Sequence, residues 1–498
     1  MQRRNFLRSA MLGSFGLSLG GPLFAKSANE SGPKSTYTLT REIKHEKDYD
    51  LVVAGGGPGG TSAAIAAARK GARVLLLEAT GCLGGMGTSG LVTAFDPMAN
   101  GEMGLVGGIM REIVETLYDR GQLAPQAGPE GWLKRHHTWT AFQPEGYKIV
   151  LDDFTTQAGV EVRFYTKLID ADYDYQNKKI NGVIIHNIDG YSYVEAKAFV
   201  DGTGDAILAD LCQAKCYEAG VDTPNIMPPT LCAMTASTDW ESMNNPMYRN
   251  SARGQQEALL KALEDGFFDH NSRHMPGLSR TGITTGFMNC GHLFNLNALR
   301  TKDLSDGMME GRKLVQRYYE FFKKYVPHCE DIEFITTANL LGVRESRRIQ
   351  GEYMLNIDDF VARRKFPDQI GIFAKAIDIH VYDDSDEEYQ RYREQFYNYG
   401  RPQPGEYFGI PYGIMVPKGW TNLWVAGRSV SADVKVQGSI RVQPACAMIG
   451  QAAGTAVIQC IEKGQKANNL DTEQLVKTLR EDGAVLPQEE LSKTMTRA

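Results

Sequence analysis

The stretch from Tyr49 to Glu78 constrains the fold more than any other part of the chain. A continuous apolar run without helical period predicts a short buried strand over Tyr49–Ala54. The alanine-rich segment Gly60–Lys70 predicts a helix that ends at a glycine, and Arg73–Leu77 predicts a second strand. The turn after the first strand has the spacing Gly-x-Gly-x-x-Gly, which is typical of a βαβ unit with a phosphate-binding turn.

Each polar or small residue of this unit has a physical task. Gly55 allows the tight turn, Gly57 lets a pyrophosphate approach the backbone, and Gly60 lets helix and strand pack closely. The helix N-terminus offers free N–H groups to the pyrophosphate. Glu78 can accept hydrogen bonds from a ribose diol, and its charge argues against the 2′-phosphate of NADP. We therefore expect a bound dinucleotide; a glycine-rich turn in another α/β domain would leave Glu78 unexplained.

Residues 1–28 resemble a signal peptide of the twin-arginine type. Arg3 and Arg4 are followed by Phe-Leu, a mildly apolar stretch and small residues suited to cleavage. A membrane anchor is the alternative, but the run is short and diluted by Gly and Ser. We expect a periplasmic protein without stable membrane insertion after signal removal, since no later stretch is expected to span a bilayer.

The composition limits the kinds of molecule that the protein is expected to bind. A formal net charge of −6 gives no reason to expect binding to nucleic acid or to an anionic membrane. The eight cysteines show no CxxC pair, so neither a metal site nor a disulfide framework is predicted. Cys212 and Cys216 are expected on one helix as buried small residues, with a redox pair as the alternative.

Later segments repeat the pattern of a nucleotide-binding site, in which glycine-rich turns lie next to predicted strands and helices. Asp201–Asp205 follows a predicted strand and precedes a predicted helix over Ala206–Ala214. Gly81–Gly90 suggests backbone laid along a ligand, with a flexible loop as the alternative. Asn422–Arg428 predicts a strand that ends in a glycine turn, and Ala445–Val457 a helix of small residues.

The pattern of strand, glycine-rich turn and helix is not repeated between about Cys232 and Gly400, which favours a substrate or cap domain for this segment. Three arginines, Arg344, Arg347 and Arg348, could bind a carboxylate or form salt bridges with nearby acids. Either His136 or His137 could serve as an acid or base, although most histidines are structural or merely exposed.

Six segments resemble a known family. They are GGGPGGTSAA from Gly55, LGGMGTSG from Leu83, DGTGDA from Asp201, GVRESRRIQGEY from Gly342, IPYGIMVPKGWTNLWVAGR from Ile410 and GSIRVQPACAMIGQAAGTA from Gly438. The chain is similar to the bacterial FAD-dependent oxidoreductases of the glutathione-reductase-like, two-dinucleotide-fold superfamily, which are related to fumarate reductase and succinate dehydrogenase flavoproteins. The resemblance implies an α/β fold: a Rossmann-like FAD-binding domain of the GR2 type (three-layer ββα) with an inserted α+β substrate or cap domain.

The resemblance also implies site residues and domain bounds. FAD would be held by Gly55, Gly57, Gly60, Glu78, Gly84, Gly85, Asp205, Gly427, Gly438, Ser439 and Ile440. The expected divisions are a signal peptide at 1–28, an FAD-binding domain at 45–232 with a possible cap insertion near 95–145, a cap domain at 233–400, a return segment at 401–465 and a peripheral tail at 466–498.

We expect an exported oxidoreductase that moves a hydride between FAD and a sugar, polyol or hydroxy acid, more as dehydrogenase than reductase. His380 is the candidate base, and Arg344, Arg348 and Arg441 are the candidates to orient the substrate. A separate electron acceptor or donor is expected, and an oligomer is possible. The alternatives are a FAD-containing lyase or isomerase without net electron transfer, and a fumarate-reductase-like reductase, although the substrate histidine and proton-delivery arginine of that subgroup have no clear copy.

Overall fold

The computed structural model describes residues 37–136, 138–242, 248–398 and 400–487. The predicted signal peptide and His137 lie outside the described residues. The chain divides into two compact units, Met1–Glu42 and Ile43–Ala498. Among the described residues of the first unit, 37–42, no helix or strand forms.

The second unit is built on a parallel sheet, which confirms the predicted α/β class. The strands lie in the order β5-β2-β1-β8, and β17 pairs with the other edge of β8. Leu51 pairs with Val74 and with Ala198, so β1 sits in the middle with apolar side chains on both faces. The parallel strands are β1 (Lys44–Ala54), β2 (Val74–Leu77), β5 (Glu161–Arg163), β8 (Gly190–Asp201) and β17 (Leu423–Val425).

An antiparallel hairpin extends this sheet. Strands β6 (Lys167–Asp174) and β7 (Lys179–Asn187) pair with each other, and β7 pairs with β8. The Asp174 side chain accepts hydrogen bonds from the backbone N–H groups of Gln176 and Asn177, and so closes the turn.

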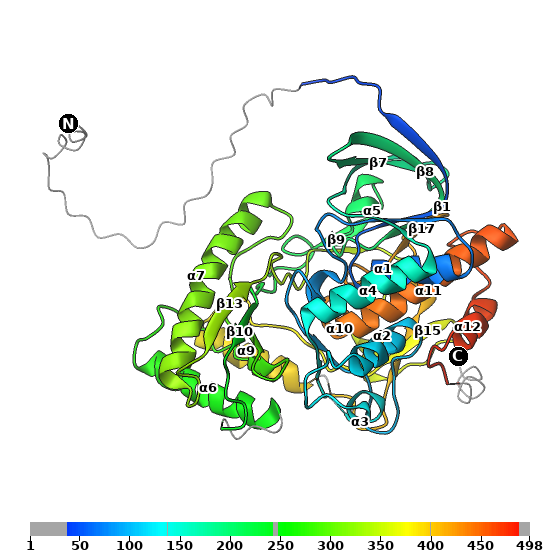
Figure 1. Ribbon diagram of the computed structural model, residues 1–498. Helices are drawn as coiled ribbons and strands as arrows, with labels where there is room; N and C mark the ends of the chain where they lie inside the picture. The colour runs from blue at the N-terminus through cyan, green and yellow to red at the C-terminus, as the bar shows by residue number, and fades with distance from the viewer. Residues whose placement is uncertain (1–36, 137, 243–247, 399, 488–498) are drawn as a thin grey trace, which may run out of the picture. The chain divides into compact units, whose positions relative to one another are not determined.

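Two helices from opposite ends of the chain pack together against the sheet. A Cβ on Gly450 of α11 (Gln443–Lys463) would lie 1.9 Å from the carbonyl oxygen of Gly59 in α1 (Pro58–Arg69). Small residues therefore let the two backbones touch. Helices α2 (Gly108–Asp119) and α4 (Pro144–Ala158) belong to the same core, and Figure 1 shows α1, α4 and α11 side by side.

Helix α11 corrects one expectation. By length and composition it could cross a membrane, whereas no such stretch is expected after the predicted signal peptide. However, 94% of its most apolar window is buried inside the protein. Its apolar surface is accounted for by packing against α1 and the surrounding core.

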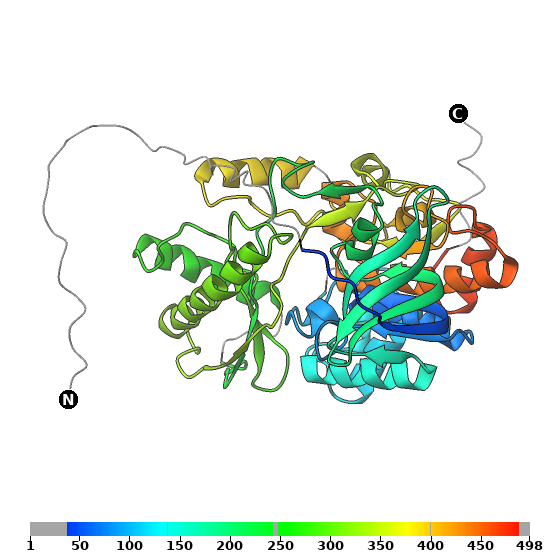
Figure 2. The same cartoon turned by 90° about the horizontal axis from the view of Figure 1, so that it is seen from above.

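A second hydrophobic core gathers mainly residues between Leu231 and Leu341. A four-stranded antiparallel sheet in the order β11-β12-β10-β13 is covered by two long helices, and Figure 2 shows this green segment beside the parallel sheet. Its elements are β10 (Ala233–Ala236), α6 (Tyr248–Glu264), β11 (Gly277–Arg280), β12 (Gly286–Asn289), α7 (Thr301–Tyr325) and β13 (Glu333–Thr337).

The segment after this second core returns to the first. Apolar residues from Leu355 to Ile379 are buried in the core that also holds α1 and α11, so most of 350–380 packs with the part that contains the parallel sheet. The remaining elements are η1 (Gly85–Gly87), β3 (Ala94–Phe95), α3 (Pro129–Leu133), β4 (Thr140–Ala141), α5 (Ile207–Leu211), β9 (Cys216–Glu218), β14 (Arg347–Ile349), α8 (Ile357–Val361), β15 (Gln369–Phe373), α9 (Asp386–Asn398), β16 (Phe408–Pro411), η2 (Tyr412–Met415), α10 (Val434–Ile440) and α12 (Thr472–Glu481).

Two further expectations are corrected by these bounds. Cys212 caps the short helix α5, while Cys216 lies in strand β9, so the two cysteines do not share a helix. The segment after Gly464 is not entirely peripheral, because Leu475 and Leu479 of α12 are buried in the main core.

Candidate active site

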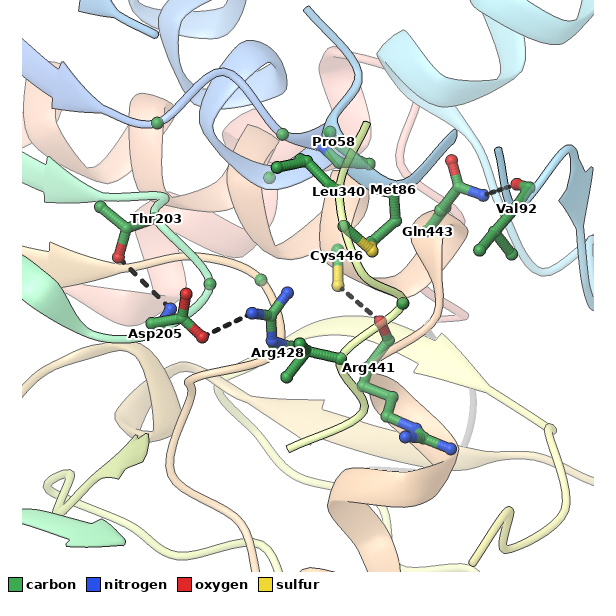
Figure 3. Close-up of a pocket in the computed structure, with 18 of the residues that line it drawn as sticks. Pro58, Met86, Val92, Thr203, Asp205, Leu340, Arg428, Arg441, Gln443 and Cys446 are labelled. Carbon is green, nitrogen blue, oxygen red and sulfur yellow. Dashed lines mark hydrogen bonds and ion pairs between the residues drawn. The ribbon is translucent and has the colours of Figure 1, made fainter. Parts of the chain in front are cut away.

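A cavity of about 630 Å³ opens where the parallel strands end. Its wall contains residues that directly follow the carboxyl ends of β1, β8 and β17, the place where open α/β sheets bind their ligands. Figure 3 shows how side chains from distant segments converge on it. The labelled lining residues are Pro58, Met86, Val92, Thr203, Asp205, Leu340, Arg428, Arg441, Gln443 and Cys446.

The turn between β1 and α1 has the geometry that a pyrophosphate needs. Gly55 has a φ of +95°, and a Cβ on Gly60 would lie 1.9 Å from the Gly55 carbonyl oxygen. By contrast, a Cβ on Gly57 would meet nothing closer than 3.8 Å, so the space above this residue is open to the cavity. The two crowded glycines build the turn, and the uncrowded one leaves room for a ligand.

Glu78 lines the same cavity and also braces the turn. Its Oε2 accepts a hydrogen bond from the backbone N–H of Gly56 at 2.8 Å, and its Oε1 accepts one from Thr80 at 2.7 Å. Each carboxylate oxygen has a further lone pair, so a ribose diol can still bind there. The bracing role was not predicted, because the sequence does not show that the turn folds back onto the end of β2.

The glycine-containing segment Asp201–Asp205, at the end of β8, is held in place by two aspartates. Buried Asp201 accepts hydrogen bonds from the backbone of Thr203 and Ala209, each at 3.0 Å, and burial raises its pKa despite these bonds. Asp205 lines the cavity and pairs with Arg428 at 2.5 Å, which ties the end of β8 to the turn after β17 (Figure 3). Gly427, with a φ of +101°, also lines the cavity, as expected of a backbone contact.

Only some of the residues expected near the flavin line the cavity. Gly85 lines the cavity but Gly84 does not, since Gly84 faces Thr88 and Leu151. Gly438, Ser439 and Ile440 are buried in α10 and do not line the cavity. A Cβ on Gly438 would lie 2.9 Å from the carbonyl oxygen of Asp378, so this glycine serves helix packing. The lining residues of this segment are Arg441, Val442, Gln443 and Cys446.

A second part of the wall is strongly charged. Lys375 Nζ lies 2.7 Å from Asp96 Oδ2, while Asp96 Oδ1 is buried and finds no partner among the described residues. Arg441 donates to the backbone oxygen of Asp378 at 2.9 Å and approaches its carboxylate at 3.3 Å. Arg344 completes the group, and all five residues line the cavity. Asp96 and Lys375 were not predicted, because each stands alone in the sequence without a motif around it.

Mutual interactions fix the charges of this wall. Burial disfavours the carboxylate of Asp378, but His380, Lys375 and Arg441 outweigh it and hold its pKa well below the ordinary value. Burial likewise opposes the charged form of Lys375, yet Asp96 and Asp378 raise its pKa. Burial and the neighbouring charge of Arg441 lower the pKa of Arg344 to about 10, so Arg344 remains a cation at neutral pH.

The other predicted catalytic residues stand back from the cavity. His380 does not line it, but its Nε2 lies 3.4 Å from Asp378 Oδ1 and its Nδ1 lies 3.0 Å from His292 Nε2. Burial, with the charge of Arg344, lowers the pKa of His380 to about 4. Buried Arg348 donates to the Ala432 carbonyl, and Arg347 pairs with Glu218 and Asp210. Neither Arg347 nor Arg348 nor His136 lines the cavity.

Taken together, the glycine turns, Glu78 and the open space over Gly57 fit a dinucleotide and define a dinucleotide-binding protein. The FAD dependent oxidoreductase family matches residues 50–479, so the chain belongs to this family and FAD is its cofactor. No curated protein matches the chain.

Several solved structures align with most of the chain at low identity. A geranylgeranyl bacteriochlorophyll reductase-like protein from Thermoplasma acidophilum aligns at 14% identity and a TM-score of 0.45, covering 88% of this chain and 84% of its own. A p-nitrophenol 4-monooxygenase from Pseudomonas putida aligns at 11% identity and a TM-score of 0.44, covering 88% and 89%. An L-proline dehydrogenase from P. horikoshii aligns at 14% identity and a TM-score of 0.40, covering 88% and 99%.

Proposed function

We propose that this protein is an FAD-dependent dehydrogenase that oxidises a small hydroxy acid, and that its substrate binds against the charged wall. The observation that carries the proposal is that the nucleotide turns and the charged wall line one cavity. A substrate held by the wall would therefore share an enclosed space with the cofactor, whose flavin supplies the hydride acceptor when bound.

Two arginines favour a carboxylate among the polar substrates that the sequence suggests. Arg441 Nη1 is buried without a hydrogen-bond partner among the described residues, and the Arg441 side chain is only 8% exposed. Arg344 donates to the Pro228 carbonyl at 2.5 Å and to Thr230 Oγ1 at 3.0 Å, which holds its guanidinium in place at the cavity. A buried donor left unpaired costs about 1–3 kcal/mol, and a substrate carboxylate would satisfy it.

Asp96 is the proposed proton acceptor. Its Oδ2 is held by Lys375, while its Oδ1 has no partner among the described residues and belongs to a residue of the cavity wall. Oxidation of an alcohol releases its hydroxyl proton, and Oδ1 is free to accept that proton. His380 then acts by positioning Asp378 instead of contacting substrate, because it does not line the cavity.

The test is anaerobic mixing of the purified holoprotein with panels of hydroxy acids, polyols and sugars. Bleaching of flavin absorbance by a hydroxy acid, but not by the matching alcohol without a carboxylate, is the expected result. Product formation without bleaching would instead favour the lyase or isomerase alternative. Bleaching by neutral sugars alone would contradict the carboxylate assignment.

A matched pair of variants sharpens this test. Arg441→Met should raise KM for the hydroxy acid about tenfold to a hundredfold, since a charge-assisted hydrogen bond contributes about 1.5–3 kcal/mol. Arg347→Met serves as control, because the Arg347 side chain is also largely buried but pairs with Glu218 and Asp210 and does not line the cavity. Equal effects of the two substitutions would argue against a substrate contact at Arg441.

A further inference from the structure

Three histidines from separate parts of the chain meet behind the charged wall. His274 precedes β11, His292 follows β12, and His380 follows β15. One ring nitrogen of each lies within 4.8 Å of the corresponding nitrogens of the other two. The rings of His274 and His292 stack with their centroids 4.0 Å apart. His292 is buried and the other two are partly buried, so the cluster lies inside the protein.

We propose that His274, His292 and His380 form a binding site for one divalent ion of the late first-row transition metals, with zinc as the reference case. Imidazole nitrogen is a preferred ligand of these ions, and three protein ligands leave a fourth position open. His292 Nε2 and His380 Nδ1 are already 3.0 Å apart. Two nitrogens each bound about 2.0–2.1 Å from a tetrahedral zinc are about 3.3–3.4 Å apart, so these two rings need to separate only slightly. The third ring, that of His274, lies farther from the other two and must move towards them when an ion binds.

The carboxylate of Asp378 supports the site from outside. Its Oδ1 lies 3.4 Å from His380 Nε2, on the far side of the ring from His292. A proton on Nε2 that is shared with this carboxylate leaves Nδ1 as the lone pair directed at His292. Metal-binding histidines are commonly oriented in this way by a carboxylate on the other ring nitrogen.

The charges around the cluster are mixed. Arg344 Nη2 lies 3.4 Å from His274 Nε2 and opposes a cation, whereas the Asp378 carboxylate offsets that repulsion. Burial favours the neutral, metal-binding form of the rings. His274 and His292 belong to segments of the second core, while His380 follows a strand of the first core. An ion bound here would therefore join the two cores directly beside the cavity.

The experiment measures metal content, which is independent of any enzymatic activity. Bound metal is first removed from the purified holoprotein with a chelator, and the protein is then incubated with zinc chloride. Excess zinc is removed by gel filtration, and the zinc content per chain is measured by inductively coupled plasma mass spectrometry. We expect about one zinc per chain in the wild type, as for a three-histidine site. His292→Ala should lose this zinc, and His186→Ala should keep it, because His186 is exposed on strand β7 away from the cluster. Wild-type zinc no higher than that of His292→Ala, or equal loss in His186→Ala, would overturn the proposal.

If His292→Ala does not fold, a second variant and a second measurement still test the zinc site. Asp378→Asn keeps the size of the supporting group but removes its charge, and it should weaken zinc binding about tenfold or more. Zinc should also raise the Tm of the wild type and leave that of His380→Gln unchanged, because ligand binding stabilises the folded state alone. A Tm that responds to zinc equally in both proteins would count against the site.

Discussion

Glu78 Oε2 accepts a hydrogen bond from the backbone N–H of Gly56 at 2.8 Å, so the residue at the end of β2 holds the glycine turn at the end of β1. One carboxylate thus shapes the turn and lines the cavity. The acidic residue of this motif is therefore part of the turn's structure before any ribose reaches it.

Replacing Glu78 should damage both roles. Glu78→Ala removes two backbone contacts, so we expect the apoprotein to lose about 1–3 kcal/mol of unfolding free energy and FAD affinity to fall about tenfold or more. Urea unfolding and flavin fluorescence titration measure the two effects. Glu195→Ala is the control, since Glu195 is a partly exposed acid that pairs with His45 and does not line the cavity. Retention of full FAD affinity by Glu78→Ala would refute the ribose role.

The two kinds of glycine in the turn should respond differently to a methyl group. Gly57→Ala meets no atom within 3.8 Å and has a φ of −68°, so the apoprotein should fold normally. FAD binding should nevertheless weaken, because the methyl group occupies the space of the pyrophosphate. Gly60→Ala places its Cβ 1.9 Å from the Gly55 oxygen and should destabilise the apoprotein itself. Thermal unfolding without FAD separates the two, and an unstable Gly57→Ala apoprotein would contradict this division.

An ion pair at the start of β1 should make stability depend on pH. The hydrogen bond from Arg163 lowers the pKa of Glu46 to about 2, below its unfolded value of 4.5. The stabilisation is fully present above the unfolded pKa and is lost as pH falls through the folded pKa. The stability difference between wild type and Glu46→Gln should therefore be about 1 kcal/mol at neutral pH, after solvent screening, and shrink between about pH 5 and pH 2. Unfolding curves across this range test it, and a constant difference would rule out the ion pair as its source.

Export is proposed from residues 1–28 alone. Arg3→Lys combined with Arg4→Lys keeps the charge but removes the twin-arginine signature, so the protein should remain in the cytoplasm. Arg8→Lys lies outside the pair and should still be exported. Immunoblots of periplasmic and cytoplasmic fractions give the result, and export of the double variant would exclude this route.

The sequence predicted the parts of the fold that obey local rules. The β1–α1–β2 unit and the turns after β8 and β17 lie close to their expected places, because periodicity and glycine spacing are local properties. Helix α12 was misjudged because its charged sequence hides the face with Leu475 and Leu479 that enters the core. The placement of Cys216 was wrong because helix α5 ends at Leu211 and the chain then enters strand β9 at Cys216.

The charged part of the cavity wall, formed by Asp96, Arg344, Lys375, Asp378 and Arg441, could be predicted from the sequence only in part. Asp96 and Lys375 pair across 279 residues, and the sequence around neither residue marks it as part of a site. Arg344 and Arg441 were found through their motifs, and both line the cavity. Arg348 and His380 belong to equally suggestive segments but point elsewhere, because the direction of a side chain depends on tertiary packing that spacing does not encode.

The contact between Gly450 and Gly59 has a consequence for how the protein matures. The glycine turn at the start of α1 packs against a helix that is synthesised several hundred residues later, and Arg441, Val442, Gln443 and Cys446 complete the cavity wall. A nascent chain therefore lacks a finished flavin site until α11 has been made. Cofactor loading must wait until this helix has left the ribosome and packed against α1.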